Sequence, residues 1–145
     1  KPRTTQVAAV STPQSSARIL LVEDNAVNTK VAILQLRRLG YSADTAENGL
    51  EAIEAIRNAK DAYDLVLMDC QMPEMDGFET THAIREQEKN TNSHLTIVAM
   101  TANAMEGDRD LCIQAGMDDY LSKPIKHENL NRMLDKWLVP PRPRF

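Results

Sequence analysis

Residues 65–69 have the sequence LVLMD, four apolar residues that end in an acid. An uninterrupted apolar run of this length is typical of a strand buried on both faces, as in a parallel sheet covered by helices. Two more such runs occur, ILLV at 19–22 and LTIVAM at 95–100. Weaker strand patterns at 41–46 and 119–122 bring the predicted number of strands to five.

Segments with helical spacing separate these strands. The first covers 27–39, has apolar residues three or four positions apart, and is followed by Gly40 as a C-cap. Asn48 and Asp76 each stand three residues before a glutamate, which predicts capped helices that begin there. The apolar stripes of the helices are interpreted as core. Two more helices are expected at 108–115 and 130–138.

Alternation of strands and helices predicts an α/β fold with right-handed crossovers. The 145 residues fit one domain, whereas a barrel of this kind needs about 250. We expect a flavodoxin-like, doubly wound (βα)5 domain at 18–138, with a five-stranded parallel sheet in strand order 2-1-3-4-5. Residues 1–17, rich in Ser, Thr, Pro and Gln, are expected to be a linker or disordered lead-in, and 139–145 a proline-rich tail.

Charge and composition argue against several classes of function. The net charge is −4 and the basic residues are scattered, so nucleic acid and anionic lipid are not expected partners. No apolar run approaches the roughly 20 residues that cross a bilayer. We expect a cytoplasmic domain without membrane contact, whose parent protein could carry an anchor elsewhere. Cys70 and Cys112 show neither a metal-binding nor a disulfide spacing, which favours a reducing intracellular setting.

Polar residues stand where four of the expected strands end. Carboxyl ends of parallel strands meet at one edge of the sheet, where ligands bind. Carboxylates gathered at such an edge repel one another unless a cation compensates them, and Mg²⁺, which prefers oxygen ligands, would do so; Mn²⁺ is an alternative. In chain order the strand-end residues are Glu23, Asp24 and Asn25, then Asp69, then Thr101, and finally Lys123 with Pro124.

Each of these residues alone has a simpler interpretation. A strand-end aspartate such as Asp69 is often a turn former, Thr101 would ordinarily be a capping hydroxyl, and Lys123 a solvated surface lysine. The set is more specific than its members, because the simpler interpretations must place all of them at one sheet edge by coincidence.

The same residues lie within four motifs that resemble the receiver domains of two-component response regulators. The resemblance runs from about Arg18 to Leu138, and the continuation DNAVN at 24–28 is most similar to receivers of hybrid sensor histidine kinases. The motifs are ILLVEDN at 19–25, LMDCQMPEMDG at 67–77, VAMTA at 98–102 and YLSKP at 120–124.

The resemblance implies a role for each matching residue. Asp69 corresponds to the phosphoacceptor. Asp24 would ligate Mg²⁺ together with Asp69 and the backbone carbonyl of Gln71, and Glu23 would act through the water shell of the ion. Lys123 would pair with the phosphoryl group.

Further implied roles concern the response to phosphorylation. Thr101 would donate its hydroxyl to a phosphoryl oxygen, and Tyr120 corresponds to the switch aromatic. Pro124 would follow a cis peptide bond. Gln71 and Asn103, two positions after the acceptor and the switch threonine, would tune dephosphorylation.

The expected function is that of a phosphoacceptor in a phosphorelay. Its partners would be the phosphohistidine domain of a histidine kinase, in the same or another chain, and a histidine phosphotransfer protein. A pseudo-receiver that binds partners without phosphorylation is one alternative. A haloacid-dehalogenase-type phosphatase is another, although that class needs an acid where this chain has Gln71. His82, His94 and His127 lie in no recognisable kinase phosphorylation motif.

Overall fold

The structure is a computed structural model that describes residues 17–60, 62–72, 75–89, 91, 93–102 and 106–138. The expected tail at 139–145, all of the lead-in except Ala17, and Asn103 lie outside these residues. The elements are β2 (Ile19–Val22), α1 (Ala26–Arg38), β3 (Ala43–Ala46), α2 (Gly49–Asn58), β4 (Leu65–Asp69), α3 (Gly77–Glu88), β5 (Thr96–Thr101), α4 (Glu106–Ala115), β6 (Asp119–Ser122) and α5 (His127–Trp137).

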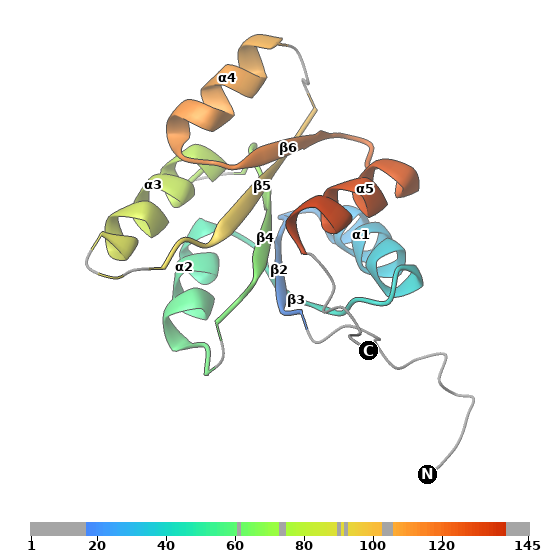
Figure 1. Cartoon of the computed structure of the whole chain (residues 1–145), viewed down its shortest axis with the longest axis horizontal. Helices are drawn as coiled ribbons and strands as arrows, with labels where there is room; N and C mark the ends of the chain where they lie inside the picture. The colour runs from blue at the N-terminus through green and yellow to red at the C-terminus, as the bar shows by residue number, and fades with distance from the viewer. Residues whose placement is uncertain are drawn as a thin grey trace.

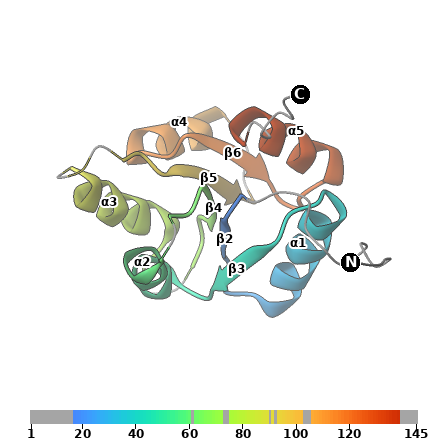
Figure 2. The ribbon, with the colours of Figure 1, turned by 60° about the horizontal axis from the view of Figure 1, so that its bottom comes forward.

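The five strands form one parallel sheet in the order β3-β2-β4-β5-β6. Numbered along the chain, this is the order 2-1-3-4-5, which confirms the doubly wound prediction. The sheet has helices on both faces: α1 and α5 cover one, and α2, α3 and α4 cover the other (Figures 1 and 2). Every residue of β2 and β4 is buried, so the apolar side chains of both strands pack against the helices on both faces of the sheet.

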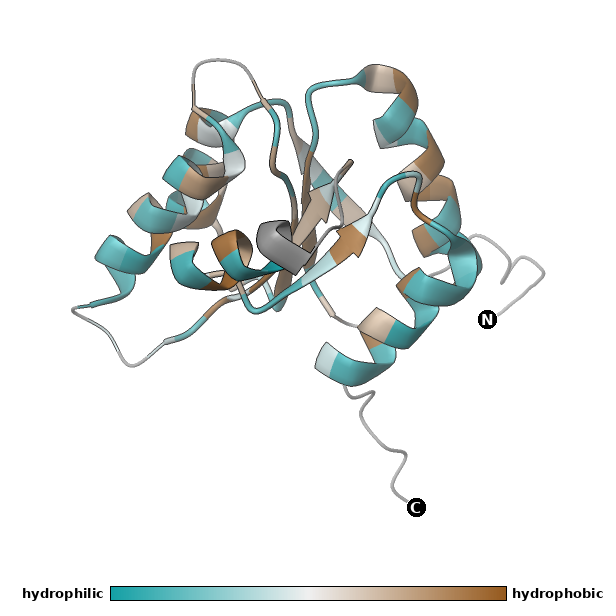
Figure 3. Ribbon diagram, turned by 90° about the horizontal axis from the view of Figure 1, so that it is seen from above, coloured by the Kyte–Doolittle hydropathy of each residue, from teal (hydrophilic) through white to brown (hydrophobic). Residues whose placement is uncertain are grey.

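The core consists of two apolar clusters, one on each face of the sheet. Leu36 of α1 and Leu134 of α5 belong to one cluster, and Ile53 of α2 and Ile84 of α3 belong to the other. Figure 3 shows the apolar strands in the middle, with hydrophilic residues along the outer faces of the helices. Within the described part of the chain, no helix is both long enough and apolar enough to cross a membrane.

The helix starts largely agree with the sequence. Asp76 and Glu79 form a capping box at α3, as expected. Asn48 caps α2 by accepting from the Glu51 amide, but the Glu51 carboxylate accepts from Glu47 N–H, so the second half of a capping box is absent there.

The apolar stripe of α1 corrects one expectation. Val27, Val31 and Leu34 were expected to be core, yet their exposed fractions are 68%, 47% and 56%. The helix packs on the sheet instead through Ala32 and Leu36, which are buried. Helical spacing identifies apolar positions, but α1 has such positions on two faces and only one can meet the sheet.

Gly77 allows the first turn of α3 to lie directly against the end of β4. A Cβ atom at this position would stand 2.6 Å from the carbonyl oxygen of Asp69 and 2.9 Å from Cα of Cys70. Both are backbone atoms that cannot rotate away, so glycine is needed for this approach. The close contact places the capped start of α3 beside the Asp69 segment.

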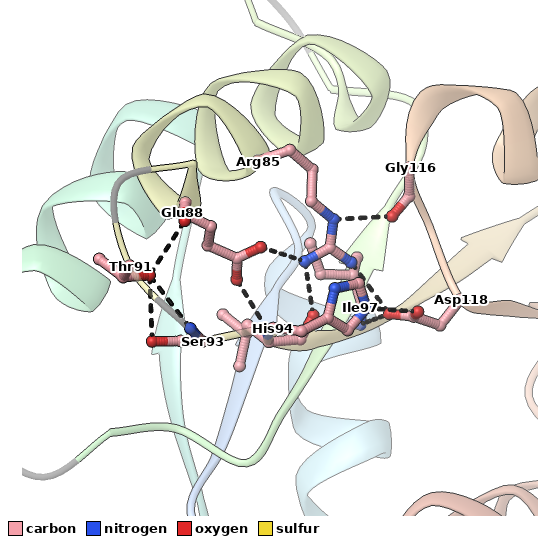
Figure 4. Close-up of polar contacts among 9 residues, drawn as sticks. Arg85, Glu88, Thr91, Ser93, His94, Ile97, Gly116 and Asp118 are labelled. Atoms are coloured by element: carbon pink, nitrogen blue, oxygen red, sulfur yellow. Dashed lines mark hydrogen bonds and ion pairs between the residues drawn. The ribbon is translucent and has the colours of Figure 1, made fainter.

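A network of charged side chains lies at the N-terminal end of β5, the end opposite Thr101 (Figure 4). Arg85 of α3 donates to the Gly116 carbonyl at 2.9 Å, the Leu95 carbonyl at 2.8 Å, and the carboxylates of Glu88 and Asp118 at 2.8 and 2.9 Å. The guanidinium thus joins the end of α3, the start of β5 and the turn after α4.

The Glu88 and Asp118 carboxylates also accept hydrogen bonds from backbone N–H groups in β5 and in the residue just before it. Glu88 accepts from Leu95 N–H at 2.6 Å, and Asp118 accepts from Ile97 N–H at 2.8 Å. His94 Nε2 lies 2.7 Å from the second oxygen of Asp118. Half-buried charges are stable in such a place only when they are paired and hydrogen-bonded, as these are.

Candidate functional site

The strand-end residues singled out in the sequence meet at the carboxyl edge of the sheet. Glu23 follows β2, Asp69 ends β4, Thr101 ends β5, and Lys123 follows β6. The order of the strands places β2 and β4 next to each other, so that the acids of these two strand ends become neighbours. The order of the strands in the sheet therefore brings the residues of four strand ends together in one site.

Three carboxylates gather at this edge. Glu23, Asp24 and Asp69 each offer an oxygen, and these oxygens lie within 4.8 Å of one another. Glu23 and Asp69 are buried, whereas Asp24 is exposed. The group therefore has a buried base and an open side that faces solvent.

Lys123 joins the two buried acids. Its Nζ lies 3.1 Å from Glu23 Oε1 and 3.0 Å from Asp69 Oδ1. Its own amide donates to the Thr101 carbonyl at 2.8 Å, which holds the lysine to the end of β5. The peptide bond between Lys123 and Pro124 is cis, as the resemblance implied.

Burial and hydrogen bonding act against each other on these acids. Burial raises the pKa of Asp69 to about 6, and the bonds from the Gln71 amide and Lys123 only partly oppose it. Burial also acts on Glu23, but the ion pair with Lys123 and the Asn25 amide leave its pKa below the usual value. The pKa of Lys123 is raised, because its bonds to the two acids outweigh the opposing effect of burial.

The other predicted residues that the structure describes lie on β5, on β6 and just after β4. Thr101 is buried at the end of β5, and Tyr120 of β6 is half-buried and packs against the apolar cluster beneath α2, α3 and α4. Gln71 donates its backbone N–H to Asp69 Oδ1 at 3.1 Å, and its side chain is exposed.

Cys70, directly after Asp69, has its sulfur 4.0 Å from that of Cys112. Both residues are buried, and burial raises the pKa of the Cys70 thiol. A buried thiol of this kind is poorly reactive, because its thiolate form is disfavoured.

Residues 19–135 match the family described as response regulator receiver domain. The chain belongs to this family. The match includes all ten elements of the fold except the last two residues of α5. The strand-end acids, the lysine and the cis peptide bond therefore belong to a receiver domain.

Curated relatives of this receiver domain are much longer proteins. It is 49% identical over 143 residues to hybrid signal transduction histidine kinase B of Dictyostelium discoideum, covering 92% of this chain and 7% of that protein. It is 43% identical over 133 residues to the sensor protein GacS of Pseudomonas syringae pv. syringae, covering 90% of this chain and 14% of that protein. The chain thus spans only a small part of these relatives.

Solved structures of other receiver domains have the same fold. The receiver domain of the sensor histidine kinase PA1611 from Pseudomonas aeruginosa PAO1, with magnesium in its active site cleft, is 47% identical with a TM-score of 0.71, covering 85% of this chain and 98% of that one. A chain in the complex of Ypd1 with the receiver domain of Ssk1 from Saccharomyces cerevisiae is 30% identical with a TM-score of 0.78, covering 85% and 89%.

Sequence reasoning missed two contributors to the site of this receiver domain. Gly77 is the last residue of the motif at 67–77. A glycine directly after the capping Asp76 could have indicated that the helix start lies close to another part of the backbone. Gln35 of α1 donates from Nε2 to the Ile125 carbonyl at 3.0 Å, two residues after Lys123. The two residues are 90 positions apart, and nothing in their spacing indicates the contact.

The raised pKa of Asp69 predicts an unusual dependence of stability on pH when divalent cations are removed with a chelator. The folded state holds the Asp69 proton more tightly than the unfolded chain, so the contribution of Asp69 to the free energy of unfolding is full at low pH and is lost as the pH rises through about 6. The lowered pKa of Glu23 acts in the opposite sense, but only below its ordinary value of 4.5.

Urea unfolding of the wild type and of Asp69→Asn at about pH 5 and about pH 7 measures this contribution. We expect the wild type to lose more stability than the variant between these two pH values. The comparison cancels the contributions of the other ionisable groups, which the two proteins share. An equal change in the two proteins would show that the Asp69 pKa is not raised.

Proposed function

We propose that Asp69 is the phosphoacceptor of this receiver domain and takes a phosphoryl group from a phosphohistidine. The observation that carries this proposal is the position of Lys123, whose single ammonium contacts both Glu23 and Asp69 at the ligand-binding edge of the sheet. A carboxylate with an adjacent cation has the two components that phosphoryl capture needs, a nucleophile and a positive charge for the transferred oxygens.

The donor set fits Mg²⁺, which the solved PA1611 receiver holds in its active site cleft. Three carboxylates with oxygens within 4.8 Å carry more negative charge than Lys123 alone can balance. Asp24, Asp69 and the backbone carbonyl of Gln71 would hold the ion, and Glu23 would act through its water shell. Mn²⁺, a similar oxygen-binding cation, is the alternative. When bound, the ion offsets negative charge on a phosphoryl oxygen.

The residues of the chain then direct the transfer. An Asp69 oxygen attacks phosphorus while the bond from phosphorus to the donor imidazole breaks, and the imidazole nitrogen keeps the bonding pair. Because the transition state of such transfers is loose, correct placement and charge compensation supply most of the catalysis. Lys123 compensates one phosphoryl oxygen, and the Thr101 hydroxyl donates to another.

Phosphorylation of Asp69 would be transmitted to the surface by a conformational change of Thr101 and Tyr120. The acyl phosphate brings a charge of about −2 to the position of one carboxylate. Movement of Thr101 toward it would leave room for the half-buried Tyr120 to follow, which would change the surface formed by α4, β6 and α5. Gln71 and Asn103 would set the dephosphorylation rate by orienting the attacking water.

The test uses the chain with Mg²⁺ and beryllofluoride, a phosphoryl analogue. We expect amide shift changes at Asp69, Thr101 and Tyr120 that require both components, and Asp24→Asn should weaken Mg²⁺ binding by at least about tenfold, since a carboxylate ligand is lost. Asp135→Asn, an exposed change near the C-terminal end of α5, is the matched control. Unchanged shifts in the wild type would favour a pseudo-receiver instead.

The exposed apolar stripe of α1 begins next to the site and suits the docking of a phosphorelay partner. Val27 is two residues after Asn25, the N-cap of α1, and Val31 and Leu34 continue the exposed stripe along the helix. A solved relative is a receiver domain in complex with the histidine phosphotransfer protein Ypd1. We therefore assign this stripe to a histidine phosphotransfer protein or to the phosphohistidine domain of a kinase. The similarity to hybrid kinases suggests that the parent protein is itself a hybrid sensor histidine kinase.

Leu34→Asp tests this assignment. We expect phosphotransfer from a phosphohistidine protein to slow by about tenfold, since a charge would replace an apolar contact, while phosphorylation by a small phosphodonor stays unchanged. Leu111→Asp on α4, where the leucine is 54% exposed, is the matched control. Equal slowing by both substitutions would show that α1 has no special part in docking.

A further inference from the structure

The loop between β6 and α5 carries Lys123 and is held at two points. On the sheet side, Lys123 N–H donates to the Thr101 carbonyl at 2.8 Å. On the helix side, the Ile125 carbonyl accepts from Gln35 Nε2 of α1 at 3.0 Å. Figures 1 and 2 show α1 and α5 side by side on one face of the sheet, and the Gln35 bond joins the loop before α5 to α1. The placement of Lys123 therefore depends on how the loop rests on α1.

Packing alone does not determine the distance between α1 and this loop. A cavity of about 170 Å³ lies between them, lined by Val31 and Ala32 of α1 and by Lys123, Pro124 and Ile125 of the loop. Side chains that face such a space lack partner atoms and exert little restoring force when the loop shifts. The Gln35 hydrogen bond is directional, and it therefore restrains the loop where packing is incomplete.

A contribution to the stability of the fold is a poor explanation for the glutamine at position 35. Its Oε1 is buried and has no hydrogen-bond partner among the described residues, which costs free energy. The orientation of the amide follows from chemistry, because the Ile125 carbonyl can only accept and the NH₂ group must face it. An apolar side chain of the same size would avoid the buried orphan oxygen.

We propose that Gln35 is a positioning residue for Lys123. By binding the Ile125 carbonyl, it holds the loop in the position in which the Lys123 ammonium contacts both Glu23 and Asp69. In this position the ammonium can also contact the oxygens of an incoming phosphoryl group. This role rests on the proposed function of Asp69. It concerns the phosphoryl half of the site, because the carboxylates that would hold the cation are placed by β2 and β4.

The test compares the wild type with Gln35→Met, which keeps the length and loses the donor. We expect beryllofluoride affinity at saturating Mg²⁺, measured from amide shifts, to fall about fivefold, as for one hydrogen bond of ordinary strength. Mg²⁺ affinity should stay within about twofold, and the midpoint of thermal unfolding within about 4 °C. Gln35→Lys restores a donor and should recover affinity. Arg37→Met, an exposed change on the same helix, is the control.

A double-mutant cycle with Lys123→Ala separates positioning from a general effect on the fold. If Gln35 acts through Lys123, Gln35→Met has no further effect on beryllofluoride affinity once the lysine is gone. Equal affinities of wild type and Gln35→Met, or the same loss in both backgrounds, would overturn the role of Gln35 alone. A wild type that binds no beryllofluoride would overturn the proposed function, and this role with it.

Discussion

Asp69→Asn is expected to abolish phosphorylation and to leave the fold intact. Asparagine has the shape of aspartate and can still accept from Gln71 N–H and from Lys123, so the contacts of β4 with its neighbours persist. Its amide is a far weaker nucleophile than a carboxylate and cannot form the acyl phosphate. The chain should then carry no acid-labile label after incubation with Mg²⁺ and a phosphodonor.

The same substitution is expected to raise the stability of the cation-free domain. At neutral pH the wild type holds Asp69 ionised in a buried place beside Glu23, although its pKa is about 6. Removing that charge should increase the free energy of unfolding by about 1–3 kcal/mol, which is the scale of a shift of one to two pKa units. The stabilisation by Mg²⁺ should fall at the same time, since a ligand is lost.

Labelling, urea unfolding and Mg²⁺ titration measure these effects, with Asp110→Asn on the exposed surface of α4 as the matched control. The control should be labelled like the wild type. Acid-labile label that persists on Asp69→Asn would place the acceptor elsewhere. A variant that is both unlabelled and much less stable would mean that Asp69 has a structural role.

Arg85→Met is expected to cause a large loss of stability, although Arg85 is remote from the site. It leaves the carboxylates of Glu88 and Asp118, each 15% exposed, without their cation, and it frees the Gly116 and Leu95 carbonyls. Breaking a buried ion pair from one side typically costs about 3–5 kcal/mol. This is a large fraction of the stability of an ordinary domain, about 5–15 kcal/mol.

Lys89→Met provides the contrast at the same end of α3. The Lys89 ammonium pairs with Glu86 at 3.0 Å, but the two side chains are 69% and 49% exposed. Exposed ion pairs contribute at most about 1 kcal/mol, so this variant should unfold close to the wild type. Urea unfolding of both variants decides the matter: a loss below about 1 kcal/mol in Arg85→Met would show that water replaces the arginine without cost.

The sequence by itself determined the order of elements and the composition of the site. Apolar runs such as 19–22 and 65–68 identify strands buried on both faces, and a sheet of such strands must be covered by helices. Parallel strands place their carboxyl ends together, and so the residues after each run could be expected to meet. Asp69 and Lys123 were brought into one prediction by this rule, and their nitrogen-to-oxygen distance is 3.0 Å.

Tertiary structure alone decided which surfaces and long-range bonds the fold makes. The spacing of Val27, Val31 and Leu34 marks an apolar stripe but does not say whether the sheet or solvent faces it. The pairing of Gln35 with Ile125 likewise depends on the path of the chain across 90 residues. Periodicity and capping are local properties that neighbouring residues report, whereas burial, ion pairing and the raised pKa of Asp69 depend on which distant segments come together in space.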